Sequence, residues 1–242
     1  MASVDIHERR YSGCGKEYEA PVSEEQTFLG RGRRTSMIEH WEVLPDTTAQ
    51  TWSFLGDLSV VDPFYLAGGT GLALQIGHRI SRDLDFFTEH HFEVDDLVQR
   101  LGSLGRFQLE MKEAQTIVGV LHETKLSFLG YPYPLLESPI GMRDIRIAGI
   151  SDIACMKIDA ISSRGTKRDF IDLFFILQTL SFEESIRLFQ TKYATIGYNL
   201  MHIKKSLVYF DDADPDPMPD MLATVDWDHV KAFFLREVSK LI

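Results

Sequence analysis

Residues 64–88, FYLAGGTGLALQIGHRISRDLDFFT, decide how this chain is interpreted. The opening run FYLA is apolar and ends in two glycines, which predicts a short buried strand that turns directly into a helix. TGLALQIGHR has the composition of that helix, and DLDFF returns to strand chemistry. The stretch therefore predicts a strand, a helix and a second strand, with two glycines at the first turn and two aspartates on the second strand.

The residues at that first turn are Gly68, Gly69 and Thr70. Glycine lets a ligand approach the backbone, and the free amides at a helix N-terminus attract anions. A purely structural Gly-Gly turn is the alternative, and the lysine of a P-loop is missing. At the end of the same helix, His78 and Arg79 are candidates for phosphate contact, although helix C-termini favour cations through the dipole alone.

Asp83 and Asp85 lie one residue apart in the second predicted strand. Positions i and i+2 of a strand share a face, so the two carboxylates lie side by side while Leu84 and Phe86 face a core. Carboxylates in this arrangement suit Mg²⁺ (or Mn²⁺), which is held by one or two carboxylates together with substrate phosphates. An exposed acidic pair at a sheet edge is the alternative. Combined with the glycine turn, the pair indicates a site for a nucleoside triphosphate and Mg²⁺.

GGTGLAL and GHRISRDLDFF resemble the opening signature of the polymerase-beta-type nucleotidyltransferase superfamily, in particular its AbiEii/AbiGii toxin branch. KIDAISSRGTKRDFIDLFFIL at 157–177 is similar to the second signature of that branch, and SLVYFDDADPDPMP is also similar to a segment of it. The resemblance covers roughly residues 40–242. It implies a nucleotidyltransferase of the EC 2.7.7 type, which moves a nucleoside monophosphate from an NTP to an acceptor hydroxyl. It also implies a toxin of a type IV toxin–antitoxin or abortive-infection pair, with a cognate antitoxin and with tRNA or another RNA as one acceptor.

The resemblance also assigns roles to individual residues. It implies metal binding by Asp83 and Asp85. The implied catalytic residues are Asp83, Asp85, Lys157, Asp169 and Asp172, and the nucleotide-binding residues are Gly68, Gly69, Thr70, Arg79, Lys157, Arg164 and Arg168. A surface ion-pair network is the alternative explanation of Arg168, Asp169 and Asp172.

The sequence departs from the wider superfamily at the strand that commonly carries a third catalytic carboxylate. Here the matching strand is KLSFL, which has Ser127 and no acid. Glu123 precedes it in a predicted turn, and Asp169 or Asp172 are the acids of the helical half that could substitute. The departure leaves the general base open and leaves the expected metal pair unaffected.

The remaining sequence predicts an α+β fold, in which a nucleotidyltransferase-like mixed sheet with flanking helices is followed by a helical half. Residues 1–36 lack apolar periodicity and are expected to be a poorly ordered extension. Residues 37–140 are expected to form the sheet-containing core, and 141–242 a mainly helical domain that closes the cleft. In the latter, Ser151 or Asp152 is expected to cap a helix, and Gly165 to break it from the next.

The formal net charge of −11 argues against non-specific coating of nucleic acid. RNA binding would therefore need a local basic cluster, for which the candidates are Arg143, Arg146, Lys157, Arg164, Lys167 and Arg168. The acidic stretch DDADPDPMPD at 211–220 is expected to be a solvated loop. No signal peptide, transmembrane run or disulfide framework is apparent, so we expect a cytoplasmic protein without membrane contact.

Two other functions remain open from the sequence. One is an inactive, nucleotide-binding relative that acts through protein–protein contact. The other is a phosphatase of the haloacid-dehalogenase type, in which D-x-D also occurs. Those phosphatases have an apolar strand directly before the first aspartate, whereas this chain has ISR there.

Overall fold

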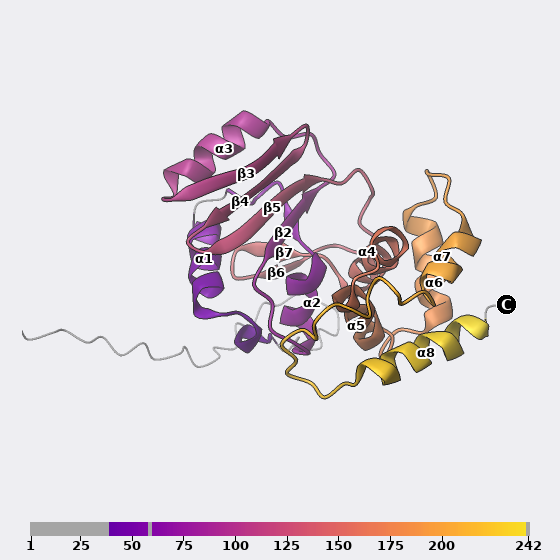
Figure 1. The fold of residues 1–242 in the computed structure, drawn as a ribbon. Helices are drawn as coiled ribbons and strands as arrows, with labels where there is room; N and C mark the ends of the chain where they lie inside the picture. Colours follow the sequence, from indigo (N-terminus) through magenta and orange to yellow (C-terminus); the bar gives the residue numbers. More distant parts are fainter. Residues whose placement is uncertain (1–38, 58–59, 241–242) are drawn as a thin grey trace, which may run out of the picture. The chain divides into compact units, whose positions relative to one another are not determined.

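A mixed, seven-stranded sheet forms the N-terminal half of the protein in the computed structural model, which describes residues 39–57 and 60–240 (Figure 1). The strand order is β3-β4-β5-β2-β1-β7-β6. β1 runs parallel to β7 and β2 runs parallel to β5, whereas the other neighbours are antiparallel. The strands are β1 (Tyr65–Leu66), β2 (Leu84–Thr88), β3 (Phe107–Glu113), β4 (Thr116–Leu121), β5 (Thr124–Gly130), β6 (Ile140–Met142) and β7 (Ile145–Ile147).

The helices follow the predicted order, and the α+β fold expected from the sequence is confirmed. Gly165 has a φ of +54° and separates α4 from α5, as predicted. None of the helices within the described residues is long and apolar enough to cross a membrane. The 3-10 helix spans Trp41–Val43, and the α-helices are α1 (Asp46–Asp57), α2 (Gly68–Ile76), α3 (Val94–Ser103), α4 (Ile150–Ser163), α5 (Lys167–Ile176), α6 (Phe182–Lys192), α7 (Leu200–Ser206) and α8 (Trp227–Ser239).

One face of the sheet is covered by α1 and α3, and the other face is left for the site. Leu84 and Phe86 of β2 are fully buried in the same core cluster as Trp52 of α1 and Leu101 of α3. Because side chains alternate along a strand, Asp83, Asp85 and Phe87 point away from this core. The apolar half of the DLDFF pattern therefore anchors the strand and turns both carboxylates outwards.

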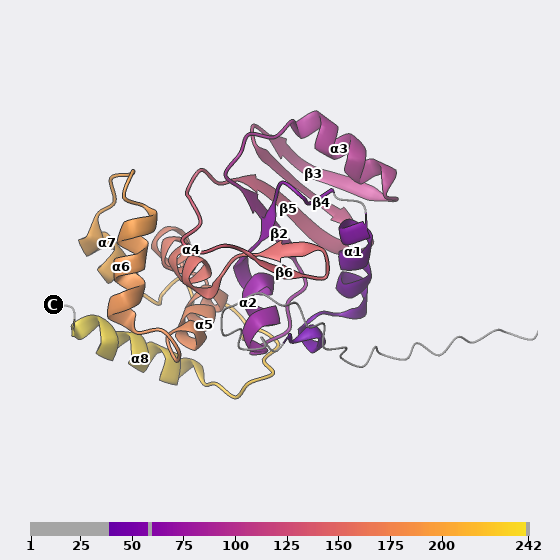
Figure 2. The same cartoon turned by 180° about the vertical axis from the view of Figure 1, so that it is seen from behind.

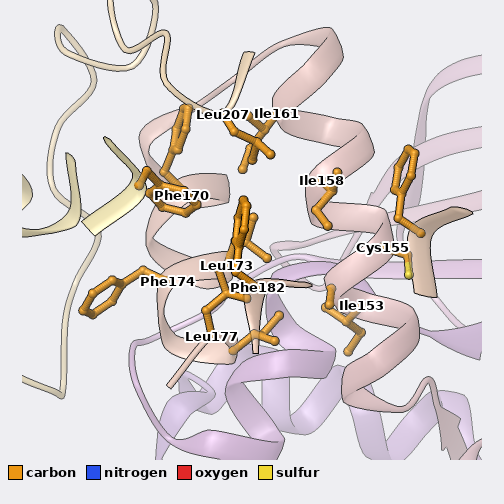
Figure 3. Close-up of a cluster of buried hydrophobic side chains, with 14 of the residues drawn as sticks. Ile153, Cys155, Ile158, Ile161, Phe170, Leu173, Phe174, Leu177, Phe182 and Leu207 are labelled. Carbon is orange, nitrogen blue, oxygen red and sulfur yellow. The ribbon is translucent and has the colours of Figure 1, made fainter. Parts of the chain in front are cut away.

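A second core holds the helical half together around α4 and α5 (Figure 3). Ile158 of α4 and Leu173 of α5 are fully buried in it. Phe170 of α5 makes edge-on contacts with Trp227 and Phe234 of α8, at ring-centroid distances of 5.9 and 5.4 Å. These contacts attach the C-terminal helix to α5, which also contributes side chains to the site described below.

The sheet contains a hairpin that the sequence did not reveal (Figure 2). The sequence predicts a mainly helical domain from residue 141, but β6 and β7 pair there through a tight turn at Arg143 and Asp144. Both turn residues have positive φ, at +41° and +66°, without a glycine. β7 pairs with β1 through Leu66 and Ile147, so the strands of the sheet extend beyond residue 140. The expected extension at residues 1–36 lies outside the described residues.

Asp152 does not cap α4, contrary to the sequence prediction. The helix begins at Ile150 after Gly149, and neither Ser151 nor Asp152 serves as its N-cap. Asp152 is instead fully buried, with its carboxylate 2.7 Å from Nζ of Lys192 and accepting hydrogen bonds from the backbone N–H groups of Leu136 and Glu137. A tertiary ion pair with α6 replaces the local cap.

Breaking this buried pair should destabilise the fold. We expect Lys192→Met, which keeps most of the apolar stem, to lower the free energy of unfolding by about 3 kcal/mol because Asp152 is left charged and buried. Urea unfolding measures the change. The matched control is Lys240→Met, which removes an exposed pair with Glu237 and should leave the urea midpoint almost unchanged. Equal midpoints for both variants would contradict the assignment.

Candidate active site

A cavity of about 500 Å³ opens between helix α4 and the face of the sheet that is opposite to α1 and α3. Its volume is in the range of cavities that bind nucleotide-sized ligands. Asp172 does not line it. The other catalytic and nucleotide-binding residues implied by the resemblance do, and they are Gly68, Gly69, Thr70, Arg79, Asp83, Asp85, Lys157, Arg164, Arg168 and Asp169.

The two glycines form a wall of the cavity at positions where a side chain would be crowded or strained. Gly68 has a φ of +63°, and a Cβ there would lie 3.2 Å from Oδ2 of Asp85. A Cβ on Gly69 would lie 2.1 Å from Nη2 of Arg79, which is an overlap. The Gly-Gly turn thus brings the backbone and the unpaired first amides of α2 next to the carboxylate and the guanidinium.

Thr70 connects this turn to the aspartate pair. Its side chain is buried, and its hydroxyl donates to the backbone carbonyl of Asp83 and accepts from the hydroxyl of Ser81 at 2.7 Å. The hydroxyl is therefore used within the protein. Thr70 fixes the distance between the start of α2 and the start of β2.

Asp83 immediately precedes β2 and Asp85 lies within it, and both carboxylates face the cavity. Burial raises the pKa of Asp85, and the negative charge of Asp83 raises this pKa further. Ser127 of β5 lies directly opposite Asp85 in the parallel pair, so the neighbouring strand supplies a hydroxyl there and no acid. Glu123 is exposed in the β4–β5 turn and does not line the cavity.

Asp172 lies behind the cavity wall and holds three side chains in place. Its fully buried carboxylate accepts two hydrogen bonds from Arg79, at 2.7 and 2.8 Å, and lies 2.6 Å from Nζ of Lys157. It also accepts from Nε2 of His78 at 2.8 Å. Burial lowers the pKa of His78 in spite of Asp172, which favours the neutral ring. The sequence made His78 a candidate for phosphate contact. In the structure His78 is buried and does not line the cavity.

Asp169 holds a second set of cationic groups at the cavity wall. Its carboxylate accepts from Lys157 at 2.9 Å, from Arg164 at 3.1 Å and from the Thr166 hydroxyl at 2.7 Å. Burial raises the pKa of Asp169, but Lys157 and Arg164 more than offset this and hold the pKa at about 2. Burial likewise lowers the pKa of Lys157, but Asp172 and Asp169 more than offset it, so this pKa lies above its usual value. The lysine therefore stays charged.

Sequence reasoning missed a lysine and an apolar wall of this cavity. Lys125 precedes Ser127 by two residues on β5, which places both on the face that carries Asp85. Its ammonium group makes none of the hydrogen bonds or ion pairs found among the described residues. The period-2 pattern of KLSFL was the available signal. The apolar wall consists of Phe87, Leu129, Tyr131 and Met156.

The basic cluster expected from the sequence is not one patch. Lys157, Arg164 and Arg168 line the cavity, but Arg143 lies 3.8 Å over the ring of Trp41 and belongs to the β6–β7 turn. Arg146 donates to the backbone carbonyl of Phe64 at 3.1 Å, and buried Lys167 donates to the carbonyl of Asp214 at 3.2 Å. Five basic and four acidic residues nevertheless line the cavity, which makes it locally cationic in an acidic chain.

The acidic loop is also held more firmly than expected. The backbone N–H of Ile80 donates to the carbonyl of Asp220 at 2.8 Å, and that of Leu222 donates to the carbonyl of His78 at 3.0 Å. Asp216 accepts from the backbone N–H of Lys167 at 3.0 Å. The stretch is a largely exposed loop, as predicted, and it is in addition attached to the segment between α2 and β2 and to the start of α5.

The low pKa of Asp169 predicts how stability responds to acid. A folded-state pKa of about 2, below the ordinary 3.8, gives stability that is present above about pH 4 and lost as the pH falls towards 2. We expect Asp169→Asn to cost about 2 kcal/mol at pH 7 and to reduce the loss between pH 4 and 2. Urea unfolding at each pH tests this, with the exposed Asp96→Asn as the control. A wild-type slope retained in Asp169→Asn would refute the ion-pair account.

Comparison with known proteins identifies the family of this chain. The family model described as "Nucleotidyl transferase AbiEii toxin, Type IV TA system" matches residues 54–137 and 131–240. An uncharacterised protein, aq_aa25, of Aquifex aeolicus (strain VF5) is 40% identical over 191 residues, which are 76% of this chain and 91% of that protein.

Solved structures of low sequence identity share the fold. MenT4, a nucleotidyltransferase toxin from Mycobacterium tuberculosis H37Rv, has a TM-score of 0.53 at 16% identity, covering 81% of this chain and 84% of its own. JHP933 from Helicobacter pylori has a TM-score of 0.51 at 18% identity, covering 82% of this chain and 93% of its own. The matched family model spans most of the chain, and the chain belongs to the AbiEii family of nucleotidyltransferase toxins.

Proposed function

We propose that this chain transfers a nucleoside monophosphate from an NTP to an acceptor hydroxyl and releases pyrophosphate. The observation that carries the proposal is one cavity lined by the Gly68–Gly69 turn, the Asp83–Asp85 pair and Lys157. In the reaction, the acceptor oxygen forms a bond to the α-phosphorus, the bond from that phosphorus to the bridging oxygen breaks, and the hydroxyl proton is released to solvent. The free amides of α2 and the cationic side chains neutralise the triphosphate.

Asp83 and Asp85 would hold Mg²⁺ or Mn²⁺. The fit rests on their chemistry, because two half-buried carboxylates face one cavity and the pKa of Asp85 is raised by burial and by Asp83, a burden that a cation relieves. Among the described residues, no group of three or more metal-binding side chains is assembled, so phosphate and water oxygens would complete the shell. When bound, the metal polarises the α-phosphate and orients it for attack.

The cations fall into two groups. Lys157 and Arg164 are held by Asp169, whereas Lys125 and Arg168 have no partner among the described residues. We assign Lys157 and Arg164 to fixed positions over the triphosphate. Lys125 and Arg168 are assigned to contacts that form only when the substrate binds. Asp169 and Asp172 are then positioning residues. Their pKa values, which Lys157 and other cations hold low, make them poor general bases.

The apolar wall indicates how the donor NTP is oriented in the cavity. Phe87 follows Asp85 by two residues on the same face of β2, and its ring packs edge-on against Tyr131 at 5.5 Å between centroids. Aromatic rings stack on nucleobases regardless of sequence. We therefore place the base of the NTP against Phe87 and Tyr131, with its triphosphate over the Gly68–Gly69 turn.

Biologically, we propose that the chain is a cytoplasmic toxin of a type IV toxin–antitoxin pair, with a cognate antitoxin and an RNA acceptor such as tRNA. Family membership supports this. The phosphatase alternative is disfavoured because Asp83 immediately precedes β2 and the residues before it form no apolar strand. An inactive relative would bind nucleotide through the same cations, so turnover is the observation that would remove that alternative.

Removing the aspartate pair should abolish transfer. We expect Asp83→Ala/Asp85→Ala to lower incorporation of label from α-³²P NTPs into cellular RNA by about three orders of magnitude, because the metal and its charge stabilisation are lost. Each of the four NTPs is tested separately with Mg²⁺. The matched control is Asp95→Ala/Asp96→Ala on the exposed face of α3, which should keep wild-type incorporation. Equal incorporation of label by the two double variants would contradict the proposed function.

Lys125 should contribute to binding of the donor NTP. We expect Lys125→Met to raise KM for the labelled NTP by about tenfold with little change in kcat, because one charge-assisted contact to phosphate is lost. Steady-state kinetics with varied NTP measures this, and Lys125→Arg should recover part of the loss. Lys112→Met on edge strand β3 serves as the control. An unchanged KM in Lys125→Met would show that the triphosphate does not reach β5.

A further inference from the structure

A second cavity adjoins the first and is not lined by the residues of the apolar wall. Its volume is also about 500 Å³. Its own wall is formed by Ile80, by Arg82 and by residues 216–220 of the acidic loop. The two cavities share the residues at their junction, which are Arg79, Ser81, Asp83, Thr166 and Arg168. A ligand in the second cavity would therefore meet a ligand in the first beside Asp83.

The wall of the second cavity is built by hydrogen bonds within the protein. Both ends of residues 216–220 are fixed, by the bond from the Lys167 N–H to Asp216 and by the bond from the Ile80 N–H to the Asp220 carbonyl. Arg79 and Met221 form an additional antiparallel backbone bridge. Pro217 and Pro219 further limit the backbone between these points. Hydrogen bonds within the protein thus hold this wall in place.

The lining suits a ligand with one phosphate group and an apolar, flat part. Three arginines and three aspartates line it, so it lacks the excess of positive charge that a triphosphate would need. Arg168 is exposed and has no ion pair among the described residues, while Arg82 pairs with Asp220 at 2.7 Å, with both side chains largely exposed. Met218 and the two prolines supply the apolar surface. A single nucleotide unit has this combination of features.

We infer that the second cavity binds the 3′-terminal nucleotide of an RNA acceptor. This inference rests on the proposed function and names the acceptor subsite of the same reaction. The terminal base lies against Met218 and the prolines, and the phosphate that precedes it contacts Arg168. The terminal hydroxyl then lies at the junction beside Asp83, where it attacks the α-phosphorus of the NTP and pyrophosphate leaves.

The kinetic test uses Met218, which is 41% exposed and lines only the second cavity. We expect Met218→Glu to raise KM for a short single-stranded RNA by about tenfold, since a stacking surface is replaced by a negative charge, and to leave KM for the NTP unchanged. Met201→Glu on α7, at a methionine that is 56% exposed, is the matched control. An unchanged KM for RNA, or equal rises for RNA and NTP, would overturn the subsite.

A second test does not depend on turnover. An RNA of the same sequence with 4-thiouridine at its 3′ end is photo-crosslinked to the wild-type protein, and the crosslinked peptide is identified by mass spectrometry. We expect the crosslink at residues 216–220, and the same RNA labelled at its 5′ end should not give it. A crosslink there without nucleotide transfer would support the subsite and refute the proposed reaction. Transfer to RNA with crosslinks elsewhere would refute the subsite alone, and label confined to small molecules would exclude an RNA acceptor.

Discussion

The buried carboxylate of Asp172 is the interaction on which the arrangement of the site depends. It joins three segments that are far apart in the chain, namely the segment between α2 and β2 through Arg79, α4 through Lys157 and its own helix α5. An uncompensated charge at this depth costs several kcal/mol, so the carboxylate and its cationic partners are stable only together. Docking of the helical half on the sheet and formation of the cavity wall are therefore one event, and the position of Lys157 follows from it.

This constraint also separates structural charge from charge that is available to a ligand. Arg79 gives two hydrogen bonds to Asp172 and is largely used inside the protein, although its edge reaches the cavity. Lys157 is shared between Asp172 and Asp169 and stays charged because both lie so close. The cavity can thus be cationic within a chain of formal net charge −11, since the acids around it fix the cations that face inwards.

The parts of the fold and the site that were predicted depend on local patterns. The alternation in DLDFF determines which side chains are buried, the glycine turn sets the start of α2, and Gly165 ends α4 because its φ is positive. The errors occur where a distant partner overrides a local preference. Asp152 has the composition of an N-cap, but Lys192, 40 residues away, takes its carboxylate. The β6–β7 hairpin has too few residues per strand for a visible period, and its turn contains no glycine.

The acidic loop shows why composition alone misjudges such a segment. Five aspartates close to a triphosphate would repel it, but three of them are compensated within the protein. Asp214 accepts from Trp227 and Lys231, Asp216 accepts from the Lys167 N–H, and Asp220 pairs with Arg82. The other two, Asp211 and Asp212, line neither cavity. The field that the loop exerts on the site is therefore much weaker than its sequence indicates, and the loop can serve as a wall next to a phosphate-binding cavity.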